Sequence, residues 1–430
     1  MPAIREEGFA IVALIGEGMK HSVGICGQAF AALGRNGVNI HAIAQGSSEL
    51  NISVVVKAAD APKAVSAIHQ EFFLSVKRVI NIFVIGTGNV GSALVKQIMN
   101  RSEWFAGEYQ TEFRIVGLAN SRKMLVSKEG ISGPDWKSLM MESEQNSNPS
   151  SFIGHMISLN LPNTIFVDNT SSDEVSSLYE GVLERSISIV TSNKLAASSS
   201  FENYSRLKRT AIRKRVHFGF GSNVGAGLPV IHTIANMVRT GDRIMRIDAV
   251  LSGSVNYIFN NYSNGKRFSE SVLQAVENGF TEPDPLTDLR GEDIIRKLLI
   301  LIRESGFHLE ASEITFENYL PVPLPEKYEP GLFLLQMREF DDYFEKQRDD
   351  LSCQNKRIRI IACYEEGKAS IRPERIGPDH PFYYLEGNDN IVSVFSERYS
   401  QQPLIIKGAG AGADVTAAGI FADILSIVNT

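Results

Sequence analysis

The stretch VINIFVIGTGNVG, residues 79–91, decides the fold of the central part of this chain. An apolar run from Ile80 to Ile85 leads into Gly-Thr-Gly-Asn-Val-Gly, and the helical pattern SALVKQIM follows. Glycines at this spacing, between a strand and a helix, permit a tight turn, a close approach of the backbone to a pyrophosphate, and packing of the helix on the strand. The helix N-terminus then faces the anion. The sequence therefore predicts an α/β domain of the Rossmann type, with a dinucleotide site formed by Gly86, Thr87, Gly88, Asn89, Val90 and Gly91.

The next strand, FRIVGLAN, residues 113–120, bears on the choice of cofactor. An NAD-specific site usually carries Asp or Glu near the end of this strand, where it binds the ribose 2′-hydroxyl. Here Ala119 and Asn120 are followed by Ser121 and Arg122, which offer a guanidinium and no carboxylate. We therefore expect NADP to be preferred, with NAD also usable. The alternative is that Arg122 is an ordinary loop residue in solvent.

Two further strands, in residues 164–175 and 186–194, end in small polar residues. An open α/β sheet presents its ligand-binding edge at such strand ends. Residues 125–160, rich in Ser, Asn, Gly and Glu, predict a loose peripheral excursion. After about residue 220 the pattern favours a mixed sheet, and the final stretch GAGAGADVTAAGIFADILSIV predicts a glycine-rich turn that enters a helix and returns to the first α/β domain.

The first 77 residues predict a small unit of their own. FAIVALIG, VNIHAIAQ and ELNISVVVK are typical of strands, whereas SVGICGQAFAALGRNG and APKAVSAIHQEFF are typical of helices. Their order is βαββα, and a final strand would complete a ferredoxin-like βαββαβ sheet. Because no catalytic cluster occurs here, we expect a regulatory or assembly module, although a purely structural appendage fits the composition equally well.

Composition excludes several classes of protein. A chain of 430 residues predicts two or three domains, and a net charge of −6 gives no basic footprint for nucleic acid or an anionic membrane. Three widely spaced cysteines without a metal-ligand pattern favour reduced thiols in a cytoplasmic protein. We also expect no signal peptide, because Met1 is followed by PAIREEGFA without an apolar h-region. We expect no membrane span, because no apolar stretch approaches roughly 18–20 residues.

The stretch GFTEPDPLTDLRGEDIIRKLLIL, residues 279–301, holds the candidate chemistry. Asp293 and Lys297 are four residues apart, so they share one face of a helix that is otherwise apolar. An ordinary ion pair would explain them, and Glu292 and Arg296 could make another. It would not explain the acidic residues that precede the helix, Glu282, Asp284 and Asp288. Several carboxylates beside one lysine suit a small substrate with its own ammonium group, and they leave the lysine for proton transfer.

Five motifs in order, SNKLAAS, SNVGAGLPVI, LSGSVNYIFN, GFTEPDPLTDLRGEDIIRKLLIL and KGAGAGADVTAAG, closely resemble the homoserine dehydrogenase family. VGICGQAFAALG and IAQGSSELNISVVV resemble the last ACT module of an aspartokinase, so the whole chain is similar to the C-terminal part of a bifunctional aspartokinase–homoserine dehydrogenase. The resemblance implies four segments: an ACT module over 1–77, an NAD(P)-binding domain over 78–220, a substrate-binding and dimerisation domain over 221–403, and a segment over 404–430 that returns to the nucleotide-binding domain.

The resemblance also implies roles for single residues. Lys297 corresponds to the family's proton donor, and Lys194 to a second active-site lysine that also contacts the cofactor. The carboxylates that hold the substrate correspond to Glu282, Asp288 and Asp293. The remaining cofactor positions correspond to Thr170 and Ser171, in a loop on the nicotinamide side, and to Gly412, in the C-terminal glycine turn.

A monovalent cation is a further implication of the resemblance. Its ligands would be backbone carbonyls at positions that correspond to Val224, Ala226 and Leu228. Family members usually have an acidic residue where this chain has Gly221, so one possible neighbour of the cation is missing.

The implied reaction is the reversible oxidation of L-homoserine to L-aspartate 4-semialdehyde. One alternative is a semialdehyde dehydrogenase, but that class needs a cysteine nucleophile, and neither Cys353 nor Cys363 lies at a glycine turn after a strand. The other is a non-catalytic regulator with a cofactor-sensing domain, against which the intact Lys194 and Lys297 argue. The family is commonly dimeric. Threonine is the expected effector, although an effector site that needs two ACT modules would be incomplete in this chain.

Overall fold

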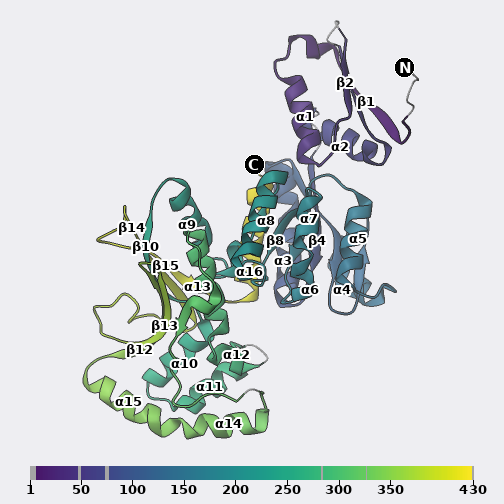
Figure 1. Ribbon diagram of the computed structural model, residues 1–430. Helices are drawn as coiled ribbons and strands as arrows, with labels where there is room; N and C mark the ends of the chain where they lie inside the picture. Colours follow the sequence, from purple (N-terminus) through teal and green to yellow (C-terminus); the bar gives the residue numbers. More distant parts are fainter. Residues whose placement is uncertain (1–5, 47–49, 73–76, 282–283, 326, 429–430) are drawn as a thin grey trace. The chain divides into compact units, whose positions relative to one another are not determined.

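The computed structural model describes residues 6–46, 50–72, 77–281, 284–325 and 327–428 (Figure 1). The chain forms two compact units. The first contains Met1–Asn193, Ser205–Gly219 and Phe421–Thr430, and the second contains Lys194–Tyr204 and Phe220–Ile420. No helix in the described ranges is both long enough and apolar enough to cross a bilayer.

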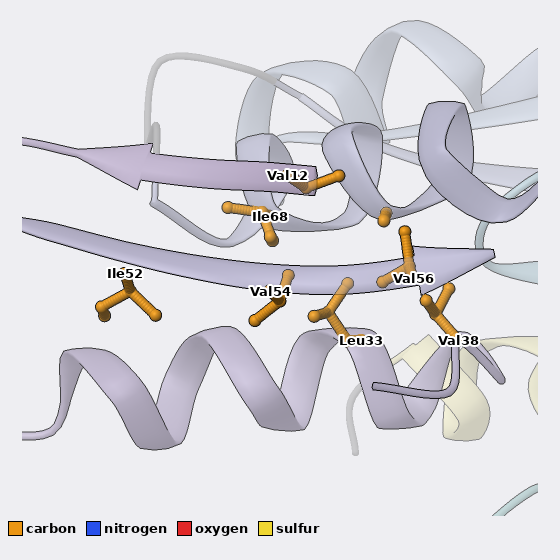
Figure 2. Close-up of a cluster of buried hydrophobic side chains, with 8 residues drawn as sticks. Val12, Leu33, Val38, Ile52, Val54, Val56 and Ile68 are labelled. Atoms are coloured by element: carbon orange, nitrogen blue, oxygen red, sulfur yellow. The ribbon is translucent and has the colours of Figure 1, made fainter. Parts of the chain in front are cut away.

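The first unit begins with a small module. Its elements are β1 (Phe9–Ile15), η1 (Glu17–His21), α1 (Ile25–Arg35), β2 (Ala42–Gln45), β3 (Asn51–Lys57), η2 (Ala58–Asp60) and α2 (Ala61–Phe72). The three strands form an antiparallel sheet in the order β1-β3-β2. Every second residue of β3 is buried (Ile52, Val54 and Val56), and these side chains form a core with Leu33 of α1 and Ile68 of α2 (Figure 2). The predicted βαββα order is confirmed.

The sheet of this module has no fourth strand among the described residues. The strand that follows α2 is β4 (Arg78–Ile85), and it pairs with β5 and β7 of a different sheet. Six consecutive residues of β4, from Ile80 to Ile85, are buried. A continuous apolar run of this kind suits a central strand of a parallel sheet, which is covered on both faces, better than the edge of a small antiparallel sheet.

The second sheet of this unit has the order β6-β5-β4-β7-β8-β9, and all its strands except β6 are parallel. Its other strands are β5 (Thr111–Ala119), β6 (Met124–Val126), β7 (Thr164–Asp168), β8 (Ser188–Thr191) and β9 (Phe218–Gly219). Its helices are α3 (Asn89–Glu108), α4 (Trp136–Glu142), α5 (Pro149–Leu159), α6 (Asp173–Ser177), α7 (Tyr179–Glu184) and α8 (Phe201–Lys214), of which α8 begins in the second unit. The predicted Rossmann-type order, with the glycine loop between β4 and α3, is confirmed.

The expectation of a loose excursion over residues 125–160 is wrong. This region contains α4 and α5, and α5 is capped by the Asn148 side chain, which accepts a hydrogen bond from the backbone N–H of Ser151. Phe152 of α5 is fully buried and packs edge-on against Phe83 of β4, with 6.0 Å between ring centroids. The polar composition reflects caps and an exposed helix face, while a few apolar residues anchor the helix on the sheet.

The second unit contains a mixed six-stranded sheet, as predicted. Its order is β11-β13-β12-β10-β14-β15, and only β11 and β13 are parallel. The strands are β10 (Ile244–Val250), β11 (Ile314–Phe316), β12 (Arg357–Glu365), β13 (Lys368–Ile376), β14 (Asp389–Ser396) and β15 (Leu404–Ala409). The helical elements are η3 (Gly221–Asn223), α9 (Val230–Arg239), α10 (Gly253–Ser263), α11 (Phe268–Glu277), α12 (Pro285–Leu289), α13 (Glu292–Glu304), η4 (Ala311–Glu313), α14 (Pro330–Glu339) and α15 (Asp341–Cys353).

The last helix, α16 (Ala413–Val428), begins in the second unit, and its residues from Phe421 onward belong to the first. Phe421 packs against Phe105 and Phe113, with 5.5 Å between the ring centroids in each pair. The C-terminal end of the chain therefore contributes an aromatic side chain to the core beside the parallel sheet.

Candidate active site

Helix α13 carries a buried lysine that is held at two points. It begins after Gly291, whose φ of +70° is left-handed and whose position a Cβ could not share, because it would lie 2.5 Å from a ring carbon of Phe316. The Lys297 Nζ lies 2.7 Å from Asp293 Oδ2 and donates a hydrogen bond of 2.8 Å to the Leu251 carbonyl oxygen. An ammonium group has three N–H donors, so one remains for a substrate oxygen.

Lys194 approaches the same carboxylate from another segment of the second unit. Its Nζ lies 3.3 Å from Asp293 Oδ1, so the two lysines bind different oxygens of one side chain. The segment that follows Lys194 is attached to α13, because the buried Arg303 donates hydrogen bonds to the carbonyl oxygens of Ala197 (3.1 Å) and Ser199 (2.6 Å). One helix thus supplies Lys297 and also fixes the chain that carries Lys194.

The charge on Asp293 follows from these two neighbours. Burial raises the pKa of its carboxyl, but the ammonium groups of Lys297 and Lys194 lower it more, so the net pKa lies well below its usual value. Asp293 is therefore a carboxylate at neutral pH, and its role is to hold two ammonium groups rather than to exchange protons.

Asp288 lies on α12 and reaches the same backbone segment through serines. Ser254 donates a hydrogen bond of 2.6 Å to Asp288 Oδ1, and the Ser254 hydroxyl lies 2.9 Å from the hydroxyl of Ser252. Ser252 is the N-cap of α10, and the residue before it, Leu251, supplies the carbonyl that Lys297 binds. The predicted residues Lys297, Asp293 and Asp288 therefore converge on the segment 251–254.

The other acidic residues of the stretch 279–301 do not share the position of Asp288 and Asp293. Asp284 is the N-cap of α12, and its side chain accepts a hydrogen bond of 2.9 Å from the Leu286 N–H, so it has a local structural role. Glu292 and Arg296 form the expected second pair at 3.4 Å, on the more exposed side of α13. Glu282 lies outside the described residues.

The glycine loop of the first unit has the close packing that a dinucleotide site needs. Gly86 has a φ of +90°, and a Cβ on it would lie 2.6 Å from the Asn169 backbone. A Cβ on Gly91 would lie 2.1 Å from the Gly86 oxygen. Gly88 is the N-cap of α3, a helix of 20 residues, so Asn89 and Val90 present its first N–H groups at the carboxyl end of β4.

Neighbouring strands bring the other predicted cofactor residues of the first unit to this edge. Ile85 pairs with Ala119 of β5 on one side and with Asp168 of β7 on the other. The N–H groups of Gly86 and Thr87 bind the Ala119 oxygen at 2.8 and 3.2 Å, so the glycine loop is fastened to the end of β5. Carboxyl ends of adjacent parallel strands are where open α/β sheets bind their ligands.

The turn after β5 separates the roles of Asn120 and Arg122. The Asn120 side chain accepts hydrogen bonds from the N–H groups of Arg122 (2.7 Å) and Lys123 (2.8 Å), so it shapes the turn. Ser121 and Arg122 are exposed, and the Arg122 guanidinium has no side-chain partner among the described residues. This turn presents a free cation and a hydroxyl, and no carboxylate.

The loop with Thr170 and Ser171 is held by a buried network that the sequence did not reveal. Asp168, fully buried, accepts hydrogen bonds from the Thr170 N–H (2.7 Å), the Tyr179 hydroxyl (2.6 Å) and the Asn193 amide (3.1 Å). Burial raises the pKa of Asp168, and these hydrogen bonds oppose that effect. The network fixes the backbone at the start of the loop.

A buried amide at this edge fits a bound dinucleotide. The Nδ2 of Asn169 is buried and has no hydrogen-bond partner among the described residues, and it lies 3.4 Å from where a Cβ on Gly91 would be. Buried donors are rarely left without a partner, so a ligand oxygen here would complete the site. The glycine cradle, the helix N-terminus and this donor all fit the pyrophosphate-bearing part of NADP or NAD.

The remaining predicted residues lie in the second unit. Gly412, with a φ of +128°, immediately precedes α16. Val224 and Ala226 are buried, and left-handed conformations at Gly225 (+76°) and Ala226 (+56°) turn the chain sharply between them. The Leu228 carbonyl also accepts a hydrogen bond of 2.8 Å from the Val230 N–H.

Several residues of the site were not predicted. They are the anchoring Arg303, the serine pair at 252 and 254, the Leu251 carbonyl, Asn169, and the Asp168 network. Arg303 had a visible signal, since it is a cation in an apolar helical run, whereas a backbone carbonyl or an amide in the right place leaves no signal in one sequence.

Families of known proteins match nearly the whole chain. The family described as homoserine dehydrogenase matches residues 229–425, and its NAD-binding domain matches residues 86–220. A family described as ACT domain matches residues 12–72.

Named relatives agree with these matches. The chain is 38% identical over 421 residues to the chloroplastic bifunctional aspartokinase/homoserine dehydrogenase 1 of Arabidopsis thaliana, covering 97% of this chain and 46% of that protein. It is 34% identical over 360 residues to the homoserine dehydrogenase of Schizosaccharomyces pombe, covering 81% of this chain and 96% of that protein. The chain therefore spans about half the length of the plant bifunctional relative and nearly all of the yeast enzyme.

A solved structure is also similar. The crystal structure of a hyperthermophilic archaeal homoserine dehydrogenase in complex with NADPH superposes with a TM-score of 0.64 at 25% identity, covering 82% of this chain and 98% of that one.

Proposed function

The chain belongs to the homoserine dehydrogenase family, and we propose that it interconverts L-aspartate 4-semialdehyde and L-homoserine with a nicotinamide dinucleotide. The main support for this proposal is the position of the Lys297 ammonium group. It is bound to Asp293 and to the Leu251 carbonyl, and one N–H donor remains. NADPH, when bound, supplies the hydride for reduction of the aldehyde, and NADP⁺ accepts it in the reverse direction.

Lys297 is the group that we assign to proton transfer. As hydride reaches the aldehyde carbon, negative charge develops on the aldehyde oxygen, and the free N–H of Lys297 donates its proton there. In the oxidative direction the neutral amine accepts the hydroxyl proton of homoserine. Asp293 keeps the amine in position in both directions, because its two oxygens are bound separately to Lys297 and Lys194.

The substrate's own ammonium group requires a negatively charged partner. Asp288 is half-buried and accepts a hydrogen bond of 2.6 Å from the Ser254 hydroxyl, which holds this carboxylate beside the segment 251–254. We assign Asp288, together with Glu282, to binding of this ammonium group. Lys194 provides a second positive charge that suits the substrate carboxylate or the cofactor.

The cofactor assignment rests on the edge of the parallel sheet. Gly86, Gly88 and Gly91 with the N-terminus of α3 would hold the pyrophosphate, and Asn169 would donate to one of its oxygens. Thr170, Ser171 and Gly412 would lie on the nicotinamide side. Because the Arg122 guanidinium is exposed and unpaired among described side chains, we assign it to the 2′-phosphate and propose that NADPH is preferred over NADH.

A cation site formed only by backbone carbonyls is a further part of the proposal. Val224, Ala226 and Leu228 would supply the oxygens, and the left-handed residues at 225 and 226 turn the chain sharply within this segment. Gly221 supplies no carboxylate, so we expect weak, non-essential binding of a monovalent cation. Replacing potassium by tetramethylammonium should change kcat by less than about tenfold, and complete loss of activity would contradict this expectation.

We propose that the ACT module helps copies of the chain to associate. We do not expect it to mediate strong feedback inhibition by an amino acid. The chain contains one such module, and an effector site shared between two modules would be incomplete. We propose a homodimer, and a cytoplasmic location consistent with three free cysteines. Light scattering on the purified chain tests the dimer, because a monomeric mass at micromolar concentration would contradict it.

The direct test of the proposed function is oxidation of NADPH in the presence of L-aspartate 4-semialdehyde. Activity that disappears in the Lys297→Met variant while NADPH binding persists would support the assignment. Equal activity in that variant would remove Lys297 from the mechanism.

A further inference from the structure

A cavity of about 320 Å³ lies in the first unit, at the edge of the parallel sheet opposite to the glycine loop. Residues of α1 and α2 of the ACT module form one side. The other side is formed by the start of β4 and by the turns that precede β7, β8 and β9. Arg78 and Ile85 are the two ends of β4, so the cavity is about 23 Å from the glycine loop at roughly 3.3 Å per residue.

Positive charge dominates this cavity. Four cationic side chains from both sides line it: Arg35, Lys63, Arg78 and Arg215. None of its described lining residues is Asp or Glu.

Two nearby carboxylates only partly balance these cations. Glu71 lies 2.5 Å from the Arg35 guanidinium, and Asp60 accepts a hydrogen bond of 2.9 Å from Asn160. Lys63 donates to the neutral Asn160 amide at 3.0 Å. Arg215 is exposed and makes no ion pair with a described residue.

Desolvation makes the unbalanced charge costly. Burial lowers the pKa of the Lys63 ammonium, and the negative charge of Asp60 only partly opposes this. Burial also lowers the pKa of Arg78, and the positive charge of Arg35 lowers it further, against the effect of Glu71. An anion in the cavity would relieve both effects, because it restores the favourable interactions that the cations lost with water.

The walls of the cavity are also well ordered by hydrogen bonds. The Asn163 backbone N–H donates to Asn36 Oδ1 of the ACT module at 2.8 Å, and the Asn163 side chain donates to Gln70 at 2.7 Å. Ser186 and Arg215 have left-handed φ values of +57° and +54°, which are unusual for these residue types. Glycine would be the residue of least strain at both turns, so the hydroxyl and the guanidinium stand there at some conformational cost.

We propose that this cavity binds a small phosphate-bearing anion, and that this ligand joins the ACT module to the nucleotide-binding domain at a site separate from the cofactor. Arginine guanidinium groups bind phosphate through paired N–H donors, and lysine contributes a point charge. The volume is at the lower end of the range for small-molecule sites, which fits inorganic phosphate or a short phosphate monoester rather than a dinucleotide.

Calorimetric titration of the purified chain, saturated with NADP so that the cofactor site is filled, tests the proposal. Inorganic phosphate is the first probe and glycerol 3-phosphate the second, both at constant ionic strength with chloride as the reference anion. We expect one saturable site per chain for at least one probe. Tighter binding of the ester would assign a monoester as the ligand class, and equal binding would assign the phosphate group alone.

Variants identify the site. Lys63→Gln with Arg215→Asn should weaken binding at least tenfold, and asparagine tolerates the left-handed backbone at 215. The matched control is Arg213→Gln, near the end of α8 and two residues before Arg215, whose side chain is 64% exposed and pairs with Glu184 outside the cavity. If the double variant does not fold, binding is measured on the single Arg215→Asn variant, which changes only an exposed residue. Absence of saturable binding to the wild type, or unchanged affinity in the Arg215→Asn variant, would overturn the proposal.

Discussion

Replacing Lys297 by methionine removes one ammonium group and leaves a side chain of similar length in the same helix. General acid–base groups typically contribute about 10²–10⁴-fold to rate, which corresponds to about 3–5 kcal/mol in the activation barrier. We therefore expect kcat to fall by that factor. NADPH affinity should change less than about threefold, because the glycine loop and Arg122 do not depend on Lys297.

The same change should destabilise the fold only moderately. Asp293 would keep Lys194 at 3.3 Å, and the Leu251 carbonyl would keep its hydrogen bond of 3.1 Å from the Asn390 amide. A hydrogen bond to a charged group contributes about 1.5–3 kcal/mol, and these remaining partners place the expected loss at the lower end of that range.

The loss of stability should also depend on pH. The folded-state pKa of Asp293 is lowered, so its contribution to stability is complete above the unfolded value of about 3.9 and is lost as the pH falls through the folded value. Without Lys297 this contribution is smaller. The variant and the wild type should therefore differ in Tm near neutral pH and converge in acid.

The neighbouring pair on α13 provides a matched control. Arg296 lies 3.4 Å from Glu292 with the same spacing along the helix, but its side chain is 39% exposed, against 10% for Lys297. Arg296→Met should keep kcat within about twofold and stability within about 1 kcal/mol, because exposed pairs contribute little. Stopped-flow and steady-state loss of NADPH absorbance measure kcat, and NADPH fluorescence measures binding. A Lys297→Met variant that kept more than a tenth of the wild-type kcat would refute the assignment of proton transfer.

Two other variants and one titration test the cofactor preference, the response to threonine and the anchoring by Arg303. Arg122→Ala should raise KM for NADPH more than for NADH, and equal effects on both cofactors would show that Arg122 does not bind the 2′-phosphate. L-Threonine should inhibit NADPH-dependent activity weakly or not at all, so inhibition at sub-millimolar threonine would mean that the single ACT module forms a complete site. Arg303→Leu should lower Tm and reduce kcat together, since the buried guanidinium holds the carbonyls of Ala197 and Ser199 behind Lys194; an unchanged kcat in a folded variant would show that this anchoring is not needed.

Local patterns in the sequence predicted those parts of the fold that local physics determines. The glycine loop between β4 and α3 follows from an apolar strand, three glycines and a helix, and the Asp293–Lys297 pair follows from helical spacing. The final strand of the ACT module could not be assigned from the sequence, because the order βαββα alone does not identify a further pairing partner. Residues 125–160 were misjudged because α5 depends on a few buried contacts such as Phe152 on Phe83.

Long-range contacts explain what the sequence did not reveal at the site. Asn120 is a plausible cofactor ligand by position, yet its side chain is occupied by the backbone of residues 122 and 123. Arg303 acts on a segment that is about a hundred residues earlier in the chain. Asp284 stands among the acidic residues but caps a helix, which only the hydrogen bond to Leu286 distinguishes.

The proposed dehydrogenase activity is measured by NADPH consumption by the purified chain with L-aspartate 4-semialdehyde as the substrate, alongside the reverse reaction with L-homoserine and NADP⁺. We predict turnover in both directions, with stoichiometric conversion of aldehyde to homoserine, and loss of turnover in the Lys297→Met variant. A folded chain that binds NADPH but converts neither substrate would contradict the assignment of a dehydrogenase and would favour a cofactor-binding regulator.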